Sequence, residues 1–446
     1  MSMRGWLGIL LMVLLVGAGV LAWIRFEGAA PEIRAPESIL VGAGSLPVVI
    51  ELADSGAGLR EVSVVLSHAL GEKTLHSEQF PGSTLGGAAR GEAPAHIEVV
   101  IDGAKLPRQV EQAFLRIFVR DWSWRDGLRG NQTQLDVSVS VDREPPRIAA
   151  ATGLTYVRRG GTGVVVYSLS EPTRRDGVQV GETFFRGFPL GERRVVFYAF
   201  PTDAPADPAI RLLAEDAAGN VGKARWPVVL NERALPQANV TLPRRFLDEK
   251  VVALARAERI EAPDVQQAFH RINTELRQRN EQQIREIVAD SAPERLWQGA
   301  FEQLHNSKVT SRFAEQRTYF IDGKKISEAT HFGYDLASTA AAPITAAAAG
   351  RVAFAGELGI YGDCVILDHG LGVASLYGHL SRLDVAPGNR VERGQPLGLS
   401  GATGLAGGDH LHFAVLVGGT YVDPLEWWDP KWVSDNVDAR LAASSP

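Results

Sequence analysis

The hydrophobic and polar positions follow four different patterns along the chain, and the first is an unbroken apolar run near the N-terminus. No charged residue occurs from Gly5 to Ile24. A run of this length is about what a helix needs to cross a bilayer, and Trp6 and Trp23 stand where interfacial aromatic residues are common. The pattern predicts a transmembrane anchor over residues 1–28.

A cleaved signal peptide is the alternative for this segment, since residues 20–22 (Val-Leu-Ala) resemble a cleavage site. The apolar run is longer than the usual core of a signal peptide, which favours an uncleaved anchor. Arg4 precedes the run, while Arg25 is followed by Glu27 and Glu32. This weak charge bias favours a cytoplasmic N-terminus. We therefore expect a single-pass inner-membrane protein whose body lies in the periplasm, or at least outside the cytoplasm.

The second pattern is a series of short alternating segments separated by Gly, Asp and Pro, such as LPVVIELADSG, HIEVVIDG and RRVVFYAF. Alternation of this kind predicts half-buried strands in antiparallel sheets. We expect a mainly β protein with two immunoglobulin-like sandwich modules, at residues 29–144 and 145–236. Such modules serve as spacers or binding surfaces, so cell-envelope proteins are candidate partners.

The two expected modules share a feature that indicates an internal repeat. In each, an apolar strand ends in an aspartate, Asp121 or Asp216. A polar turn with Gly-Asn follows, at Asn131 or Asn220, and then another strand. This order resembles the closing hairpin of bacterial immunoglobulin-like modules.

In the third pattern, within residues 237–310, the apolar period changes from two to that of a helix. Pro263 stands at a plausible helix start and Pro293 ends the run. We expect a helical connector that packs on its neighbours and that is also a candidate to contact the groove of the next domain. Its apolar stripe consists of Val265, Phe269, Ile272, Leu276, Ile284 and Ile287.

Composition narrows the classes of function. The net charge is −6 with a pI near 6.0, and the chain has no block of Lys or Arg. A nucleic-acid partner is therefore not expected, since phosphate binding calls for a basic face. The single cysteine, Cys364, lies in the apolar stretch CVIL, which excludes an intramolecular disulfide and favours core packing.

The fourth pattern is again β-rich, and it holds half of the ten histidines. His410 and His412 stand at the head of the apolar run FAVLV, so in a strand both imidazoles project from one face. A His-x-His pair alone is usually two polar residues on a strand face. His331 and Asp335, four residues apart in ATHFGYDLA, supply further donors. Zinc accepts such a set of nitrogen and oxygen donors tetrahedrally and keeps one position for water.

These elements occur in a fixed order: His331-x-x-x-Asp335, then YGHLS around His379, then HLHF. With PITAAAAGRVAFAG, VAPGNRVERGQPLG and the closing YVDPLEWW, the stretch from about 313 to 428 resembles LytM/lysostaphin-type zinc metallopeptidases, which cut peptide bonds in bacterial peptidoglycan. The resemblance implies an antiparallel β peptidase domain, which we expect at 311–430, followed by a tail at 431–446.

The resemblance also implies roles for single residues. It makes His331, Asp335 and His412 the ligands of one Zn²⁺ ion, and His379 and His410 the catalytic pair beside the attacking water. An unligated imidazole can take or return the proton that hydrolysis moves. The expected function is a zinc metalloendopeptidase acting on peptidoglycan peptides. The alternative is a non-enzymatic regulator or scaffold that activates other cell-wall hydrolases, and the intact ligand set favours the enzyme.

For several neighbouring residues the sequence predicts a position or a role less specifically. His369, in DHGLG, is expected in a hairpin turn. Asp409, where family members often have a small residue or Pro, is expected at the groove rim. Tyr361 and Tyr377 are candidates to steady an oxyanion, although packing is favoured for both. The chain has no phosphate-binding loop and no serine nucleophile elbow, so covalent catalysis is not expected.

Overall fold

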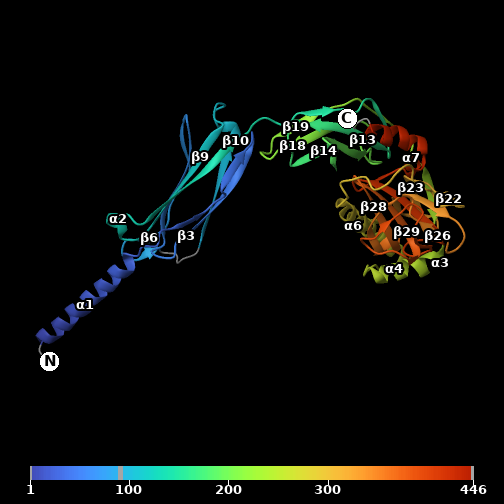
Figure 1. Cartoon of the computed structure of the whole chain (residues 1–446). Coiled ribbons are helices and arrows are strands. Elements are labelled where there is room, and N and C mark those ends of the chain that lie inside the picture. Colours follow the sequence, from blue (N-terminus) through green and yellow to red (C-terminus); the bar gives the residue numbers. More distant parts are fainter. Residues whose placement is uncertain (1–2, 89–93, 443–446) are drawn as a thin grey trace. The chain divides into compact units, whose positions relative to one another are not determined.

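The structure, a computed structural model, describes residues 3–88 and 94–442 and is mainly β, as the sequence predicts (Figure 1). Many of its sheets are antiparallel. The chain forms two compact units, the first of residues 1–146 with 215–221 and the second of residues 147–214 with 222–446.

The first element is the helix α1 (Met3–Arg25). Its segment Trp6–Arg25 has a mean hydropathy of 2.7, and none of its most apolar part is buried, so by length and composition it could cross a membrane. Arg25, at its end, is buried and donates a hydrogen bond to the carbonyl of Trp122 in the first sandwich. Both an anchor and a signal sequence fit this helix.

The first sandwich has two sheets around its own core. Alternate residues of its central strand, such as Leu115, Ile117 and Val119, are fully buried, as the period of two predicts. One sheet has the order β1 (Glu32–Arg34), β3 (Ser45–Ala53) and β8 (Ala95–Asp102), and the other β2 (Ser38–Val41), β10 (Gln132–Val141), β9 (Gln112–Asp121), β4 (Leu59–His68) and β5 (Gly71–Gln79).

The second sandwich is smaller. Its core strands are almost continuously apolar, and Val164, Val165 and Val166 are all buried. One sheet has the order β11 (Ile148–Ala150), β13 (Thr162–Leu169), β17 (Arg193–Ala199) and β16 (Phe188–Leu190). The other has β15 (Thr183–Arg186), β14 (Arg175–Val180), β18 (Ile210–Glu215) and β19 (Val221–Ala224), and β12 (Thr155–Arg158) pairs with β20 (Val228–Asn231).

The internal repeat has the same hydrogen bonds in both copies. The carboxylate of Asp121 accepts from the backbone N–H of Asn131 at 2.7 Å and from its side-chain amide at 2.8 Å. Asp216 accepts from the corresponding groups of Asn220 at 2.8 and 2.9 Å. Each aspartate is buried, and its charge is satisfied by the turn that follows it. The shared Asp and Gly-Asn pattern therefore closes a hairpin in each copy.

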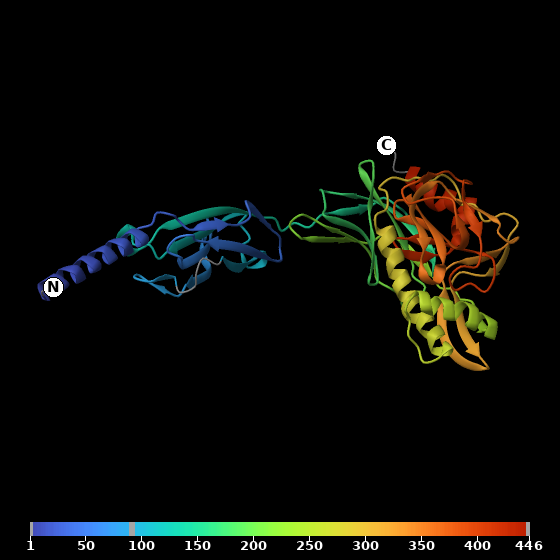
Figure 2. The same ribbon diagram turned by 90° about the horizontal axis from the view of Figure 1, so that it is seen from below.

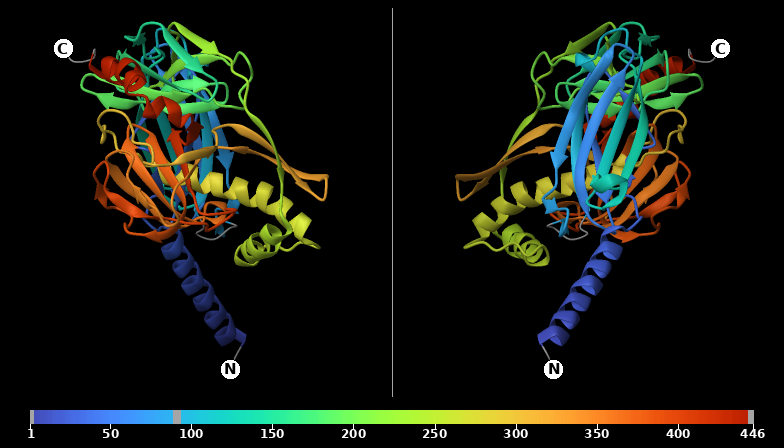
Figure 3. Two further views of the ribbon diagram at one scale, coloured as in Figure 1. Left: turned by 90° about the vertical axis from the view of Figure 1, so that its right-hand side faces the viewer. Right: turned by 90° about the vertical axis from the view of Figure 1, so that its left-hand side faces the viewer.

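The C-terminal domain is built on a ten-stranded sheet. Its main path is β22 (Lys308–Ser311), β25 (Tyr334–Ala337), β32 (Leu411–Val417), β29 (Val373–Leu383), β28 (Asp363–Gly370), β27 (Gly350–Glu357) and β30 (Arg390–Val391), with β26 (Pro343–Thr345), β31 (Pro396–Ser400) and β33 (Thr420–Val422) beside it. A three-stranded sheet of β21 (Gln237–Thr241), β23 (Glu315–Ile321) and β24 (Lys324–His331) adjoins it, and β23 and β24 form a projecting hairpin (Figure 3).

Of the helices around this domain, α6 runs between it and the second sandwich (Figure 2), α7 lies next to that sandwich, and α3 and α4 lie at the other end of the domain (Figure 1). The predicted stripe is buried at Phe269, Ile272, Leu276 and Ile284. Asp264 caps the helix by accepting from the N–H of Gln267, so the helix begins just after Pro263, as predicted. The helices are α3 (Arg244–Phe246), α4 (Val252–Ala257), α5 (Val265–Arg271), α6 (Arg277–Ala289), α7 (Pro424–Trp428), α8 (Pro430–Val433) and α9 (Ala439–Ala442), with π-helical turns at Leu247–Val251, Ile272–Leu276 and Ser434–Asp438.

The second sandwich, the helices and the C-terminal domain share one hydrophobic core. Phe197 of the sandwich lies 5.9 Å from Trp297 and 6.2 Å from Trp427, between ring centroids. The carboxylate of Glu426 accepts from the backbone N–H of Thr162 at 2.7 Å. The second sandwich is thus packed into the unit that holds the C-terminal domain.

This contact predicts a pH-dependent stability. Burial raises the pKa of Glu426 from 4.5 to about 8, against the hydrogen bond from Thr162. The folded protein favours the protonated carboxyl. The contribution of this group to the free energy of unfolding is therefore complete below the unfolded pKa of 4.5. It is lost as the pH rises from there through about 8, by about 1.4 kcal/mol per pH unit. We expect the melting temperature of the wild type to fall, relative to that of Glu426→Gln, between pH 5 and 8. A pH-independent difference between the two proteins would contradict this.

Candidate metal centre

Two consecutive strands, β24 and β25, and a third strand, β32, which pairs with β25, position the candidate metal ligands. His331 ends β24 and Asp335 lies in β25. Asp335 is directly opposite His412 in the antiparallel pairing of β25 with β32. Gly333 lies against the His412 ring, where a Cβ atom would be 2.6 Å from Cε1. The short link between the two strands can pass His412 only because this residue is glycine.

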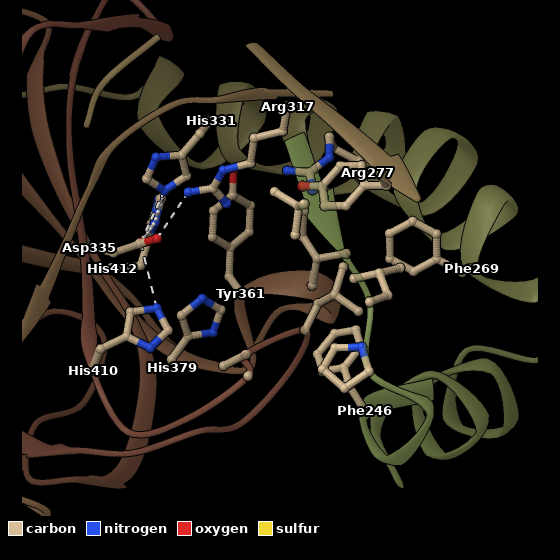
Figure 4. A pocket seen from close by; sticks show the side chains of 18 of the residues that line it. Phe246, Phe269, Arg277, Arg317, His331, Asp335, Tyr361, His379, His410 and His412 are labelled. Carbon is tan, nitrogen blue, oxygen red and sulfur yellow. Dashed lines mark hydrogen bonds and ion pairs between the residues drawn. The ribbon is translucent and has the colours of Figure 1, made fainter. Parts of the chain in front are cut away.

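Three donor atoms converge at this crossing (Figure 4). The Nε2 atom of His331 lies 3.0 Å from Oδ1 of Asp335 and 3.1 Å from Nδ1 of His412. The distance from His412 Nδ1 to the same Asp335 oxygen is 3.0 Å. Tetrahedral zinc ligands at 2.0–2.2 Å from the ion are roughly 3.3 to 3.6 Å apart, only slightly more than this triangle. All three side chains are buried.

The protonation of His331 is set by its surroundings. Its Nδ1 lies 3.0 Å from the carbonyl oxygen of Arg312, which can only accept, so Nδ1 carries the hydrogen and Nε2 keeps its lone pair. That lone pair faces a second imidazole nitrogen and a carboxylate oxygen. Three electron-rich atoms so close together repel one another unless a proton or a metal ion lies between them. The site therefore has the donor types and spacing of a metal centre.

Arg317, on β23, supports the carboxylate from the other side. Its guanidinium donates to Oδ2 of Asp335 at 3.2 Å and to Glu315 at 2.8 Å. Burial would raise the pKa of Asp335, but the charge and hydrogen bond of a His331 ring that also carries a proton on Nε2 outweigh burial and hold that pKa well below its usual range. Oδ1 is thus left facing the histidines, and the carboxyl is ionised.

Two further imidazoles lie beside this triangle. The rings of His379 and His410 are 4.9 Å apart, and Nε2 of His410 is 3.5 Å from Oδ1 of Asp335. The Nδ1 atoms are turned to carbonyl oxygens, that of Thr403 at 2.9 Å for His379 and that of Gly408 at 2.8 Å for His410. Both Nε2 atoms are therefore free of hydrogen in the neutral rings.

The conformation and pKa of these histidines differ from the ordinary values. His379 has φ of +63°, a left-handed conformation that is uncommon for a residue with a side chain. Burial lowers the pKa of His412 to about 4 and that of His379 well below its usual range. Burial also lowers the pKa of His410, but the hydrogen bond and charge of Asp335 outweigh it, so that this pKa is raised.

The two candidate tyrosines, Tyr361 and Tyr377, have different surroundings in the structure. Tyr361 lines the pocket, its ring 5.5 Å from that of His412, but its hydroxyl is engaged with the hydroxyl of Tyr421 at 2.9 Å. Tyr377 is buried in the sheet, where its hydroxyl accepts from the N–H of Ala347 at 2.8 Å. Packing, which the sequence favoured for both, describes Tyr377, whereas Tyr361 forms part of the pocket wall.

The prediction that His369 lies in a turn is wrong. His369 is in β28 and fully buried. Its imidazole can be buried because both ring nitrogens have hydrogen-bond partners, the carbonyl of Ala349 and the hydroxyl of Ser375, each at 2.7 Å. Asp409 accepts from the hydroxyl of Ser400 and, at 2.9 Å, from the N–H of Ala341, which fixes the loop before His410.

The metal-site residues form one side of a pocket of about 250 Å³ (Figure 4). The opposite side is made by the helical region, with Phe246, Phe269 and Arg277 (Figure 4). The sequence made the helical connector a candidate to contact the groove and placed Phe269 in its stripe, but it gave no role to Phe246, Arg277 or Arg317. The amphipathic stripe indicated that the helices pack on a neighbour, but no pattern indicated which of their residues face the pocket.

The sequence comparisons match the C-terminal domain. Residues 329–424 match Peptidase family M23. The chain is 40% identical over 95 residues to the DD-carboxypeptidase/endopeptidase Mpg of Neisseria meningitidis, over 21% of this chain and 22% of that protein. It is 33% identical over 119 residues to the peptidoglycan DD-endopeptidase ShyB of Vibrio cholerae, over 27% of each. The matches thus span about a quarter of the length of these relatives.

Among solved structures, a putative M23 peptidase from Pseudomonas aeruginosa is 24% identical, with a TM-score of 0.40, over 61% of this chain and 94% of that one. The family match and the sequence relatives define the C-terminal domain as a peptidase domain. It is a domain of peptidase family M23, in agreement with the resemblance to LytM/lysostaphin-type enzymes.

Proposed function

We propose that this protein is a zinc-dependent metalloendopeptidase that hydrolyses peptide bonds in peptidoglycan. The convergence of His331 Nε2, Asp335 Oδ1 and His412 Nδ1 within 3.0–3.1 Å of one another carries this proposal. The relatives named as peptidoglycan endopeptidases support the substrate class. Two imidazoles and one carboxylate are a donor set that suits a single zinc ion with an open position.

When bound there, zinc supplies a Lewis acid that polarises the scissile carbonyl and acidifies water. The side chains of the protein then move the protons. The oxygen of the attacking water bonds to the carbonyl carbon, and the open Nε2 of His410 or His379 accepts the proton that the water loses. As the C–N bond breaks, the same imidazoles return a proton to the leaving amine.

The N-terminal helix supports a location at the membrane. We propose that α1 anchors the protein in the inner membrane of a cell envelope and that the body lies in the periplasm, where peptidoglycan is found. The first sandwich, with its own core, is a candidate spacer or surface for cell-envelope proteins. We also propose the domain limits expected from the sequence, namely an anchor at 1–28, sandwich modules at 29–144 and 145–236, a helical connector at 237–310, a peptidase domain at 311–430 and a tail at 431–446.

Metal removal tests the function. Full-length protein in detergent should release soluble fragments from dye-labelled peptidoglycan. A strong chelator should stop the release, and one equivalent of zinc per chain should restore it, because catalysis depends on the ion held by His331, Asp335 and His412. Release that continues unchanged after the metal has been removed would contradict the proposal. Zinc binding without any release would instead favour the regulator alternative.

A further inference from the structure

Arg277 is the cation in the pocket that has no carboxylate partner among the described residues. The pocket lining holds one other arginine, Arg317, whose charge is offset by Glu315 and Asp335. Within the described ranges, the side chain of Arg277 donates only to two neutral acceptors, the carbonyl of Asn273 at 3.3 Å and its side-chain oxygen at 2.9 Å. A guanidinium has five N–H groups, so most of its donors stay open to the pocket.

The local backbone holds Arg277 in this position. The helix has a π-helical turn at Ile272–Leu276, and the N–H of Arg277 bonds to the carbonyl of Ile272 instead of that of Asn273. The Asn273 carbonyl is thereby left to accept from the Arg277 side chain. Such turns inside helices are often found at functional sites.

Asn273 is itself fixed by the strand that ends in His331. Its amide nitrogen donates to the hydroxyl of Ser327 at 2.9 Å and to the carbonyl of Glu328 at 3.1 Å. The amide oxygen is therefore oriented toward Arg277. A chain of contacts from β24 through Asn273 thus places the guanidinium on the pocket side opposite the metal-site residues (Figure 4).

The two carboxylates that flank Arg277 on the helix do not pair with it: Glu275 pairs with Arg271 at 3.0 Å. Glu281 is one helical turn further on, and within the described part of the chain it makes no ion pair with Arg277. Burial raises the pKa of Glu281, although Arg277 and Arg285 act in the opposite direction. The remaining guanidinium N–H groups of Arg277 are thus available to an acceptor that enters the pocket.

We propose that Arg277 forms a subsite for a free carboxylate on the substrate residue adjoining the scissile bond. The inference rests on the proposed hydrolytic function, since it specifies which peptides the same pocket prefers. A planar guanidinium binds a carboxylate through two parallel hydrogen bonds, which an amide cannot match in charge. A charged hydrogen bond of this kind corresponds to about a tenfold to hundredfold preference.

The test uses metal-loaded full-length protein and two cross-linked peptides that differ only in this carboxylate, free in one and amidated in the other. Wild-type protein should cleave the free form with a kcat/KM about tenfold to a hundredfold higher. Arg277→Gln should remove the preference, and Arg277→Lys should keep part of it. The matched control is Arg279→Gln, since Arg279 is exposed, pairs with Glu258 at 3.8 Å and should not affect the preference.

Equal cleavage of both peptides by the wild type, or a preference that persists in Arg277→Gln, would overturn the subsite while the hydrolytic function stands. If the wild type cleaves neither peptide, the subsite is tested by binding of the same peptides to full-length His410→Ala, measured by calorimetry. Tighter binding of the free carboxylate, without cleavage by the wild type, would support the subsite and overturn the hydrolytic function. No preference in binding and no cleavage would overturn both.

Discussion

Asp335→Ala should lose both its zinc and all measurable hydrolysis of peptidoglycan. The substitution leaves two imidazole nitrogens, His331 Nε2 and His412 Nδ1, and removes the only charged donor of the set. Two neutral ligands do not hold a catalytic zinc ion against competing water. The metal content of purified full-length protein, measured by elemental mass spectrometry, should fall from one zinc per chain to none.

Asp409→Ala is the matched control for this variant. Asp409 is also a carboxylate close to His410, but its oxygens accept hydrogen bonds from Ser400 and Ala341. This variant should therefore keep its zinc. If Asp335→Ala retained one zinc per chain and hydrolysed peptidoglycan like the wild type, the proposed ligand set would be wrong.

The second large effect is expected for His410→Ala, which should keep its zinc and lose activity. His410 stands outside the triangle of donor atoms, with its Nε2 3.5 Å from Asp335 Oδ1. Its removal deletes a proton acceptor and not a ligand. Loss of a general acid–base group lowers kcat by about a hundredfold to ten-thousandfold. Metal content and the rate of peptide cleavage, measured on one preparation, test both halves of the prediction.

The exposed His305 offers a control, since His305→Ala should change neither quantity. A His410→Ala protein that had lost its zinc would assign this residue to the metal centre. A variant that kept nearly full activity would leave His379 as the sole proton acceptor beside the site.

The convergence at the candidate metal centre follows from features that a sequence displays. His410 and His412 alternate with Leu411, so a strand places both on one face. The same period places Asp335 on β25 opposite His412 once those two strands pair. The turn at His369 was predicted wrongly because DHGLG contains two glycines, and the hairpin is formed by its last residues while His369 remains in the strand.

Arg277 and Arg317 could not be assigned from the sequence because their roles depend on long-range packing. Arg317 reaches Asp335 only because β23 pairs with β24 and lies over the site. Arg277 faces the pocket because a π-helical turn changes the phase of its helix, which no apolar stripe reveals. If the helix were regular, without the π-helical turn, Arg277 would lie on a different face relative to the apolar stripe.

The packing of the second sandwich also lay beyond the sequence patterns. Alternating strands predicted a sandwich, and they predicted it as a separate module. The contact that joins it to the peptidase domain depends on a few buried groups, among them Phe197, Trp427 and Glu426. Phe197 is far from Glu426 and Trp427 in the chain, and the closing YVDPLEWW, which contains the latter two, does not indicate a contact with the sandwich.

The identity of the products tests the central claim most directly. Isolated peptidoglycan should be incubated with zinc-loaded full-length protein, and the soluble products separated and identified by mass spectrometry. We expect cross-linked peptides to be converted to uncross-linked ones, with a new amine and a new carboxyl group for every bond cut and with the glycan strands intact. Cross-links that persist in the presence of protein carrying one zinc per chain would contradict the proposed endopeptidase function.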